Sequence, residues 1–334
     1  MVLRLLQGFS ASGEQPGANS LSLEHAPEGR RSFFTSFTLG GTQAGLVVAT
    51  AVWLPISAMP DSQLLTWGWR IPFWFSAVVV AAGLLIRRRL DDGPVFEETA
   101  RDGVAKVPLA ILLRDHPANV LRVIFGALAS TVSTIFAVYA LSFATDTVGL
   151  DKTTMLWVAI VTNVVALGAI PLWATLADRI GRKPVFIFGT LGSGALMFAY
   201  LGAIASGQYV LIFATAILMS GVVYSAQNGV WPALYGEMFP TRVRLSGMAI
   251  GTQIGFAIGG FAPTAAAAID GGGTGGWVPV AFYVLGSSVL AAAAIFTARE
   301  TCHMTFPELD EGEDGERAPA KVARSRERAP AGIA

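Results

Sequence analysis

Charged and amide side chains lie inside the first apolar stretch of this 334-residue chain. Arg4, Gln7 and Glu14 fall on one face when successive residues are turned by about 100° along a helix. A charged side chain in hydrocarbon costs roughly 2.5–3.5 kcal/mol, so such a group usually faces a cavity or a partner. We expect Arg4 to attract an anionic solute or pair with a protonatable acid, and Glu14 to take part in proton transfer. The alternative is a structural role, in which neighbouring helices satisfy both charges.

A second polar face occurs in a later apolar stretch. Its residues follow the helical spacing i, i+3, i+4 and i+7 and are Tyr224, Gln227, Asn228 and Trp231. This face predicts the lining of an aqueous cavity, and hydrogen bonding between helices is the alternative. Four further polar residues are candidates for the same pathway: Gln43, Tyr139, Asn163 and Gln253. For Gln43 and Gln253, helix packing is the alternative.

The composition indicates a membrane protein. Hydrophobic residues make up 53% of the chain and charged residues 14%, compared with about 25% charged residues in soluble domains. Stretches long enough to cross a bilayer lie near 2–24, 33–57, 71–90, 118–146, 155–177, 184–205, 209–235, 246–269 and 277–298. We therefore expect an all-α membrane protein with nine spans, of which the first is the least apolar.

Basic residues orient the predicted spans. Arg70 and Lys152 fall on one side, whereas nearly all other lysines and arginines outside the first span fall on the opposite side. Because short cytoplasmic loops retain positive charge, we expect the carboxyl end to be cytoplasmic in a multi-pass protein of the plasma (inner) membrane. Nine crossings then place the amino end outside.

Polar segments divide the chain into four predicted parts. Residues 1–90 would form the remainder of an N-terminal bundle and 91–117 a cytoplasmic linker. Residues 118–298 would form a C-terminal bundle of six helices. Residues 299–334, with an acidic block followed by a basic block, are predicted to be a disordered cytoplasmic tail.

An internal repeat relates the two predicted bundles. Glu24, Arg30 and Arg31 follow the first span, and Glu237, Arg242 and Arg244 follow the seventh in the same order. The sequence Gly-Thr-Gln-x-Gly then occurs inside the next span at 41–45 and again at 251–255. We interpret the regularly spaced glycines in these spans mainly as sites of close helix packing.

The loop between the fifth and sixth spans carries the most specific motif. Its residues Asp178, Arg179, Gly181, Arg182 and Lys183 resemble the signature loop of the major facilitator superfamily, although Ala174 stands where the full signature has glycine. Further stretches at 4–10, 24–27, 67–73, 93–97 and 239–244 resemble the metabolite:proton symporters of that superfamily.

This resemblance implies a major facilitator type helical bundle in which nine of twelve transmembrane helices are present and the first three are missing. It implies proton-coupled symport of a small organic solute, a carboxylate or a zwitterion, by alternating access. The signature loop would act as a gate that packs near residues 30–34, where Asp178 would accept backbone N–H groups and pair with Arg30 or Arg31. A truncated, transport-inactive fragment is the alternative.

Other functional classes have no motif in the sequence. The phosphate-binding pattern Gly-x-x-x-x-Gly-Lys-Ser/Thr and the zinc pattern His-Glu-x-x-His do not occur, and the chain has a single cysteine, Cys302. We expect no enzymatic activity, no cofactor or metal and no nucleic-acid partner. The expected partners are the solute, a proton and the lipid bilayer, with a monomeric transport unit.

Overall fold

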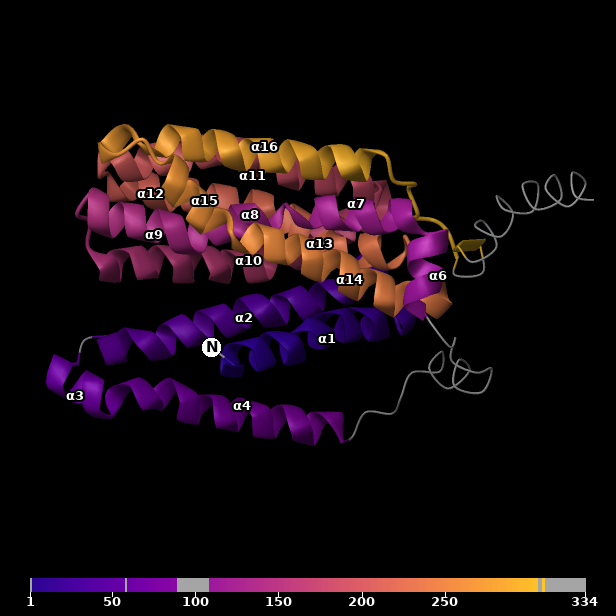
Figure 1. The fold of residues 1–334 in the computed structure, drawn as a ribbon, viewed down its shortest axis with the longest axis horizontal. Helices are drawn as coiled ribbons and strands as arrows, with labels where there is room; N and C mark the ends of the chain where they lie inside the picture. Colours follow the sequence, from indigo (N-terminus) through magenta and orange to yellow (C-terminus); the bar gives the residue numbers. More distant parts are fainter. Residues whose placement is uncertain (1, 58, 89–107, 306–307, 310–334) are drawn as a thin grey trace, which may run out of the picture.

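The computed structural model describes all residues except 1, 58, 89–107, 306–307 and 310–334, and the described part contains helices and no strands (Figure 1). The N-terminal elements are α1 (Val2–Glu24), α2 (Arg31–Ser57), α3 (Asp61–Thr66), η1 (Gly68–Arg70) and α4 (Ile71–Arg87). The later elements are α6 (Pro108–Asp115), α7 (Pro117–Ala127), α8 (Ser130–Thr134), η2 (Ile135–Tyr139), α9 (Ala140–Ser142), η3 (Phe143–Thr147), α10 (Lys152–Ile180), α11 (Arg182–Ser206), α12 (Tyr209–Ala216), η4 (Ile217–Val223), α13 (Tyr224–Gly236), α14 (Thr241–Gly260), α15 (Ala262–Ile269), η5 (Gly273–Gly275) and α16 (Trp277–Phe296).

Among the described residues, eight helical segments are long and apolar enough to cross a membrane. They are Arg31–Ile56, Gly68–Leu85, Pro117–Thr147, Lys152–Ile180, Arg182–Ser206, Tyr209–Gly236, Thr241–Ile269 and Gly273–Phe296. The first of the nine expected spans, 2–24, forms the 23-residue helix α1 but is not among these eight, because polar residues interrupt it. The prediction of an all-α membrane protein is confirmed.

In the described part of the chain, three short π-helical segments interrupt otherwise α-helical spans. They are η2 and η3 in the span Pro117–Thr147 and η4 in the span Tyr209–Gly236. The sequence analysis did not predict them. In η4, a Cβ atom on Gly221 would lie 3.2 Å from the carbonyl oxygen of Thr162, so glycine permits α10 to approach this widened turn closely.

The helices run side by side as a bundle, with α1, α2 and α4 along one side in Figure 1. Helix α2 packs against α10 and α13, and α1 packs against α2, α14 and α13. Helix α4 exposes Phe73, Trp74 and Val78, as expected for a helix whose outer surface is solvated by lipid.

The repeated glycines have different environments in the two halves. A Cβ atom on Gly255 would lie 2.5 Å from both Ala127 Cβ and Ile124 O, so α14 contacts α7 directly through this position. At the equivalent Gly45 no described atom lies within 4 Å of such a Cβ atom. The packing interpretation is therefore confirmed for Gly255 and wrong for Gly45 in this structure.

Two predicted segments differ in part from expectation. Residues 89–107 of the predicted linker lie outside the described residues, but its end forms α6. The predicted tail is described at 299–305 and 308–309, and Thr301 and Cys302 are each only 4% exposed against the bundle. The start of that tail is therefore part of the folded structure.

The glycine comparison predicts unequal effects of two equivalent substitutions. Gly255→Ala should destabilise the protein by about 1–3 kcal/mol, because the added methyl group overpacks the α7–α14 contact. Gly45→Ala should be neutral or slightly stabilising, because alanine favours a helix and the site is open. Thermal unfolding of the detergent-solubilised protein measures both, and equal loss of stability in the two variants would contradict the assigned packing.

Candidate functional site

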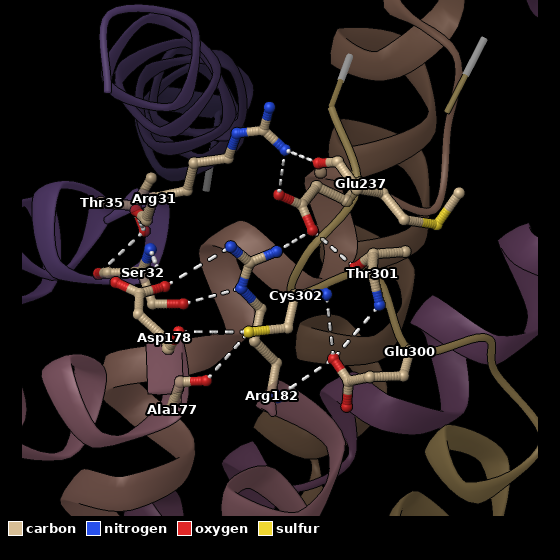
Figure 2. Close-up of polar contacts among 12 residues, drawn as sticks. Arg31, Ser32, Thr35, Ala177, Asp178, Arg182, Glu237, Glu300, Thr301 and Cys302 are labelled. Carbon is tan, nitrogen blue, oxygen red and sulfur yellow. Dashed lines mark hydrogen bonds and ion pairs between the residues drawn. The ribbon is translucent and has the colours of Figure 1, made fainter. Parts of the chain in front are cut away.

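One end of the bundle carries a buried cluster of charged residues, which we call the charged end: Arg31, Asp178, Arg182 and Glu237 (Figure 2). Asp178, in the last turn of α10, accepts hydrogen bonds from the backbone N–H groups of Ser32 at 3.0 Å and Phe33 at 2.9 Å. These N–H groups belong to the first turn of α2, where no carbonyl oxygen of the helix itself is available. A carboxylate is favourable at this position because the N-terminus of a helix carries partial positive charge.

Arg182 connects the two carboxylates of the charged end. Its side chain is fully buried, pairs with Asp178 at 3.4 Å and also binds Glu237. Its Nε atom donates to the Ser32 hydroxyl at 2.9 Å. A buried guanidinium needs such partners, because its removal from water is otherwise costly.

Glu237 joins the charged end to α2 through a second arginine. Arg31 donates to Glu237 Oε1 at 3.0 Å. Sequence analysis expected Arg30 or Arg31 to pair with Asp178. Arg31 binds Glu237 directly, and the charge of Asp178 also stabilises the Arg31 cation, whereas Asp178 binds Arg182 directly and Arg30 is exposed. The difference arises because Asp178 lies directly beneath the first turn of α2, where the backbone N–H groups and Arg182 occupy its oxygens.

The internal repeat contains a second pair of the same kind. Glu24 at the end of α1 lies 3.9 Å from Arg244 near the start of α14. In the internal repeat, Glu24 corresponds to Glu237 and Arg31 corresponds to Arg244. The two ion pairs, Glu237–Arg31 and Glu24–Arg244, are therefore equivalent, and each joins one half of the chain to the other. Each glutamate therefore lies across from the arginine of the other half.

Residues 300–304, which we call the C-terminal strap, cover the charged end. Glu300 accepts the backbone N–H groups of Arg182 at 3.1 Å and Lys183 at 2.9 Å, at the start of α11. Thr301 donates to Glu237 at 2.5 Å. Gly181, with φ of 108°, leaves room for the Glu300 carboxylate, which would lie 3.0 Å from a Cβ atom there.

Cys302 in the strap donates to the carbonyl oxygens of Ala177 and Asp178, each at 3.4 Å. Burial raises the pKa of this thiol. The Arg182 guanidinium opposes this increase without reversing it, and the carboxylates of Glu300 and Asp178 add to it. The sulfur is therefore held protonated, which suits a donor to carbonyl groups. The strap was not identified from the sequence as part of the site.

Other predicted residues of the charged segments lie at the surface. Arg179 and Arg242 are exposed. Lys183 is half-buried and donates to the carbonyl oxygen of Phe296, the last residue of α16, at 2.9 Å.

A cavity of about 290 Å³ lies between α2 and the C-terminal helices. Five predicted residues line it: Gln43, Tyr224, Gln227, Asn228 and Trp231. Trp231 contacts Tyr235 and Phe256, with ring centroids at 5.4 and 5.8 Å, so one part of the wall is aromatic.

A second cavity of about 200 Å³ shares Gln43, Leu46, Ser133 and Tyr224 with the first. Asn163 and Tyr200 also line it. The predicted polar residues of α2, α10 and α13 therefore border two adjoining spaces.

The remaining pathway candidates are not among the described residues that line either cavity. Arg4 and Gln7 belong to α1, but their side chains lie outside the described part of the structure, and Glu14 is exposed on α1. Tyr139 donates to Asp270 at 2.8 Å and is not part of the lining of either cavity. Gln253, the repeat counterpart of Gln43, is half-buried elsewhere on α14.

Sequence analysis missed several polar residues of the first cavity: Gln15, Thr42, Ser130, Ser133 and Thr134. The last three follow the spacing i, i+3 and i+4 within an apolar span, the same signal that identified the face on α13. The criterion could therefore have found them.

Eight apolar spans among the described residues, with polar cavities between some of them, define a multi-pass helical membrane protein. Residues 97–312 match the family "Sugar (and other) transporter" and residues 1–145 match "Major Facilitator Superfamily". The chain belongs to the major facilitator superfamily.

The relatives in this family include transporters of several small solutes. The shikimate transporter of Escherichia coli (strain K12) is 32% identical, over 90% of this chain and 70% of the relative. The citrate-proton symporter of Klebsiella pneumoniae is 29% identical, over 80% of this chain and 61% of the relative. These relatives confirm the resemblance to metabolite:proton symporters.

The fold is also similar to that of a solved transporter. The proton:xylose symporter XylE bound to 6-bromo-6-deoxy-D-glucose has a TM-score of 0.69 at 19% identity, covering 90% of this chain and 70% of that chain. At this identity the likeness concerns the fold alone.

The buried charges of the charged end predict different effects for two arginines of the signature loop. Arg182→Gln should destabilise the protein by about 3–5 kcal/mol, because Asp178 and Glu237 would lose a buried counter-charge. Arg179→Gln, at an exposed position four residues from Lys183, should change stability by less than about 0.5 kcal/mol. Thermal unfolding in detergent measures both variants. Similar stability of the two would show that the buried cluster does not hold this end together.

Proposed function

We propose that this protein is a secondary active transporter that couples the symport of a small organic solute to protons by alternating access. The single observation that carries the proposal is the contact of Asp178 with the first turn of α2. It joins α10, from the later six-span part of the chain, to the earlier part at one end of the bundle, beyond the polar cavities. Such a contact can hold one entrance closed and must break for that entrance to open.

The proposed orientation follows the basic residues: the charged end and the carboxyl end are cytoplasmic, and the membrane is the plasma (inner) membrane. The charged end is then the cytoplasmic gate, closed in this structure. The names of the relatives, which include transporters of shikimate, citrate and proline/betaine, support a small organic solute as the substrate class.

The proposed solute site is the cavity bordered by Gln43, Tyr224, Gln227, Asn228 and Trp231. Arg4 is assigned on sequence grounds to the solute carboxylate and Glu14 to proton coupling, with Gln7 on the same predicted face. Asn163 borders the second part of the pathway. We propose no enzymatic step, because the transport of an unmodified solute requires none.

Proton coupling predicts a specific effect of one acidic residue. In proteoliposomes made with this chain, uptake driven by a proton gradient should fall at least tenfold in Glu14→Gln, whereas solute binding should change less. Asp146→Asn, an exposed acid at the opposite end of the bundle, should leave both unchanged. Uptake that persists after a protonophore collapses the gradient would exclude obligatory coupling. Absence of any uptake by this chain, with or without a gradient, would favour the transport-inactive alternative.

The gate assignment predicts a shift in access. Asp178→Asn should increase labelling of a cysteine at Asn228 in inside-out vesicles by about two- to fivefold, because a helix-terminal charge contributes ~0.3–1 kcal/mol. The background carries Cys302→Ser, and Asp146→Asn, which replaces an exposed acid at the opposite end of the bundle, serves as the control. If Asp178→Asn alters neither labelling nor transport, the loop has no gating role.

A further inference from the structure

The two cavities lie one after the other along the bundle. On α2, the residues that line the first cavity fall within 39–46 and those that line the second fall within 43–50. In the span that contains η4 and α13, they fall within 224–235 and 220–224. Because α2 begins and α13 ends at the charged end, the first cavity lies nearer to that end and the second lies farther from it.

Four side chains line both cavities and therefore lie between them: Gln43, Leu46, Ser133 and Tyr224. We call these four residues the shared layer. Gln43 and Leu46 belong to α2, in the earlier part of the chain, whereas Ser133 belongs to α8 and Tyr224 to α13, in the later six-span part. Both parts of the chain thus contribute to the layer that divides the two cavities.

Tyr224 is the largest and the most deeply buried member of the shared layer. Its side chain is buried, with 5% of the residue exposed. Its hydroxyl group is hydrogen-bonded to the side chains of Ser133 and Gln227. The contact with Ser133 joins two different spans, so the aromatic ring is held in place across the layer. Such a ring is a barrier that a change of rotamer can remove, because a side chain occupies one of a few discrete rotamers.

We propose that Tyr224 is an internal gate, which separates the solute site in the first cavity from a vestibule open to the outside, formed by the second cavity. This inference rests on the proposed function, which places the solute in the first cavity and the closed charged end on the cytoplasmic side. A solute that enters from the outside has to pass the shared layer, so the Tyr224 ring has to leave its contact with Ser133. Alternating access requires such a barrier on each side of the solute site.

The test measures how fast a membrane-impermeant thiol reagent labels single cysteines in vesicles of both orientations. The background carries Cys302→Ser. Asn163→Cys reports on the second cavity and Asn228→Cys on the first. From the outside, Asn163→Cys should label at least about tenfold faster than Asn228→Cys, because labelling of a closed compartment follows the small population of its open form. Equal rates at the two positions would overturn the inference, and so would failure of Asn163→Cys to label from the outside.

Two substitutions of Tyr224 test the gate itself. Tyr224→Ala removes the ring and should raise the outside labelling rate of Asn228→Cys at least about tenfold, with the rate of Asn163→Cys unchanged. Tyr224→Phe keeps the core filled but removes both hydrogen bonds of the hydroxyl group, and it should raise the rate by about two- to tenfold. Tyr283→Phe is the matched control, because Tyr283 is a half-buried tyrosine of α16 that does not belong to the described lining of either cavity. An unchanged rate in Tyr224→Phe, or an equal increase in Tyr283→Phe, would overturn the assignment.

The outcomes also separate this inference from the proposed function, because labelling does not depend on uptake. The expected labelling rates without any proton-driven uptake would leave the internal gate and remove symport. Proton-driven uptake with labelling rates that respond to neither substitution of Tyr224 would leave symport and remove the internal gate.

Discussion

The burial of Arg182 is the constraint on which the charged end depends. A guanidinium that is removed from water must be surrounded by carboxylates and hydrogen-bond acceptors, or the folded state loses several kcal/mol. Here the acceptors come from three different elements: Asp178 on α10, Glu237 after α13 and Ser32 on α2. Satisfying one buried charge therefore fixes the relative positions of three helices. Glu300 of the C-terminal strap accepts the N–H groups of Arg182 and Lys183, the first two residues of α11. The strap is thereby attached to the same cluster.

The charged end and the cavity share the same two helices. Helix α13 carries Gln227, Asn228 and Trp231 along the cavity and is followed directly by Glu237. Helix α2 starts at the charged end with Arg31 and Ser32 and reaches the cavity about two turns later, at Leu39. A rigid helix transmits a displacement along its length. A displacement of α2 relative to α13 at the cavity therefore also acts on the ion pair between Arg31 and Glu237, and this is the physical link that the proposed gating requires.

The sequence predicted the spans closely because bilayer thickness sets their length and apolar runs mark them directly. It also located the polar face of α13 and the contact of Asp178 with the start of α2. It did not identify Glu237 as the partner of Arg31, because that choice depends on where the ends of α2 and α13 meet in space. The π-helical turns and the ordered strap were likewise unpredicted, since both depend on contacts between segments distant in the chain.

Internal repetition predicted equivalent positions more reliably than equivalent roles. Gly45 and Gly255 occupy the same place in the repeat, but only Gly255 contacts a neighbouring described helix. Gln43 borders both cavities, and Gln253 is not among the described residues that line them. The reason is that α14 packs against α7 with its glycine face, whereas α2 packs against α10 with a different part of its surface. By contrast, the two ion pairs Glu237–Arg31 and Glu24–Arg244 join equivalent residues. Each pair crosses the contact between the two repeats, and the symmetry that relates the repeats therefore relates the two pairs as well. Residues at the contact between repeats thus keep their partners, and residues that face away from it acquire new roles in each half.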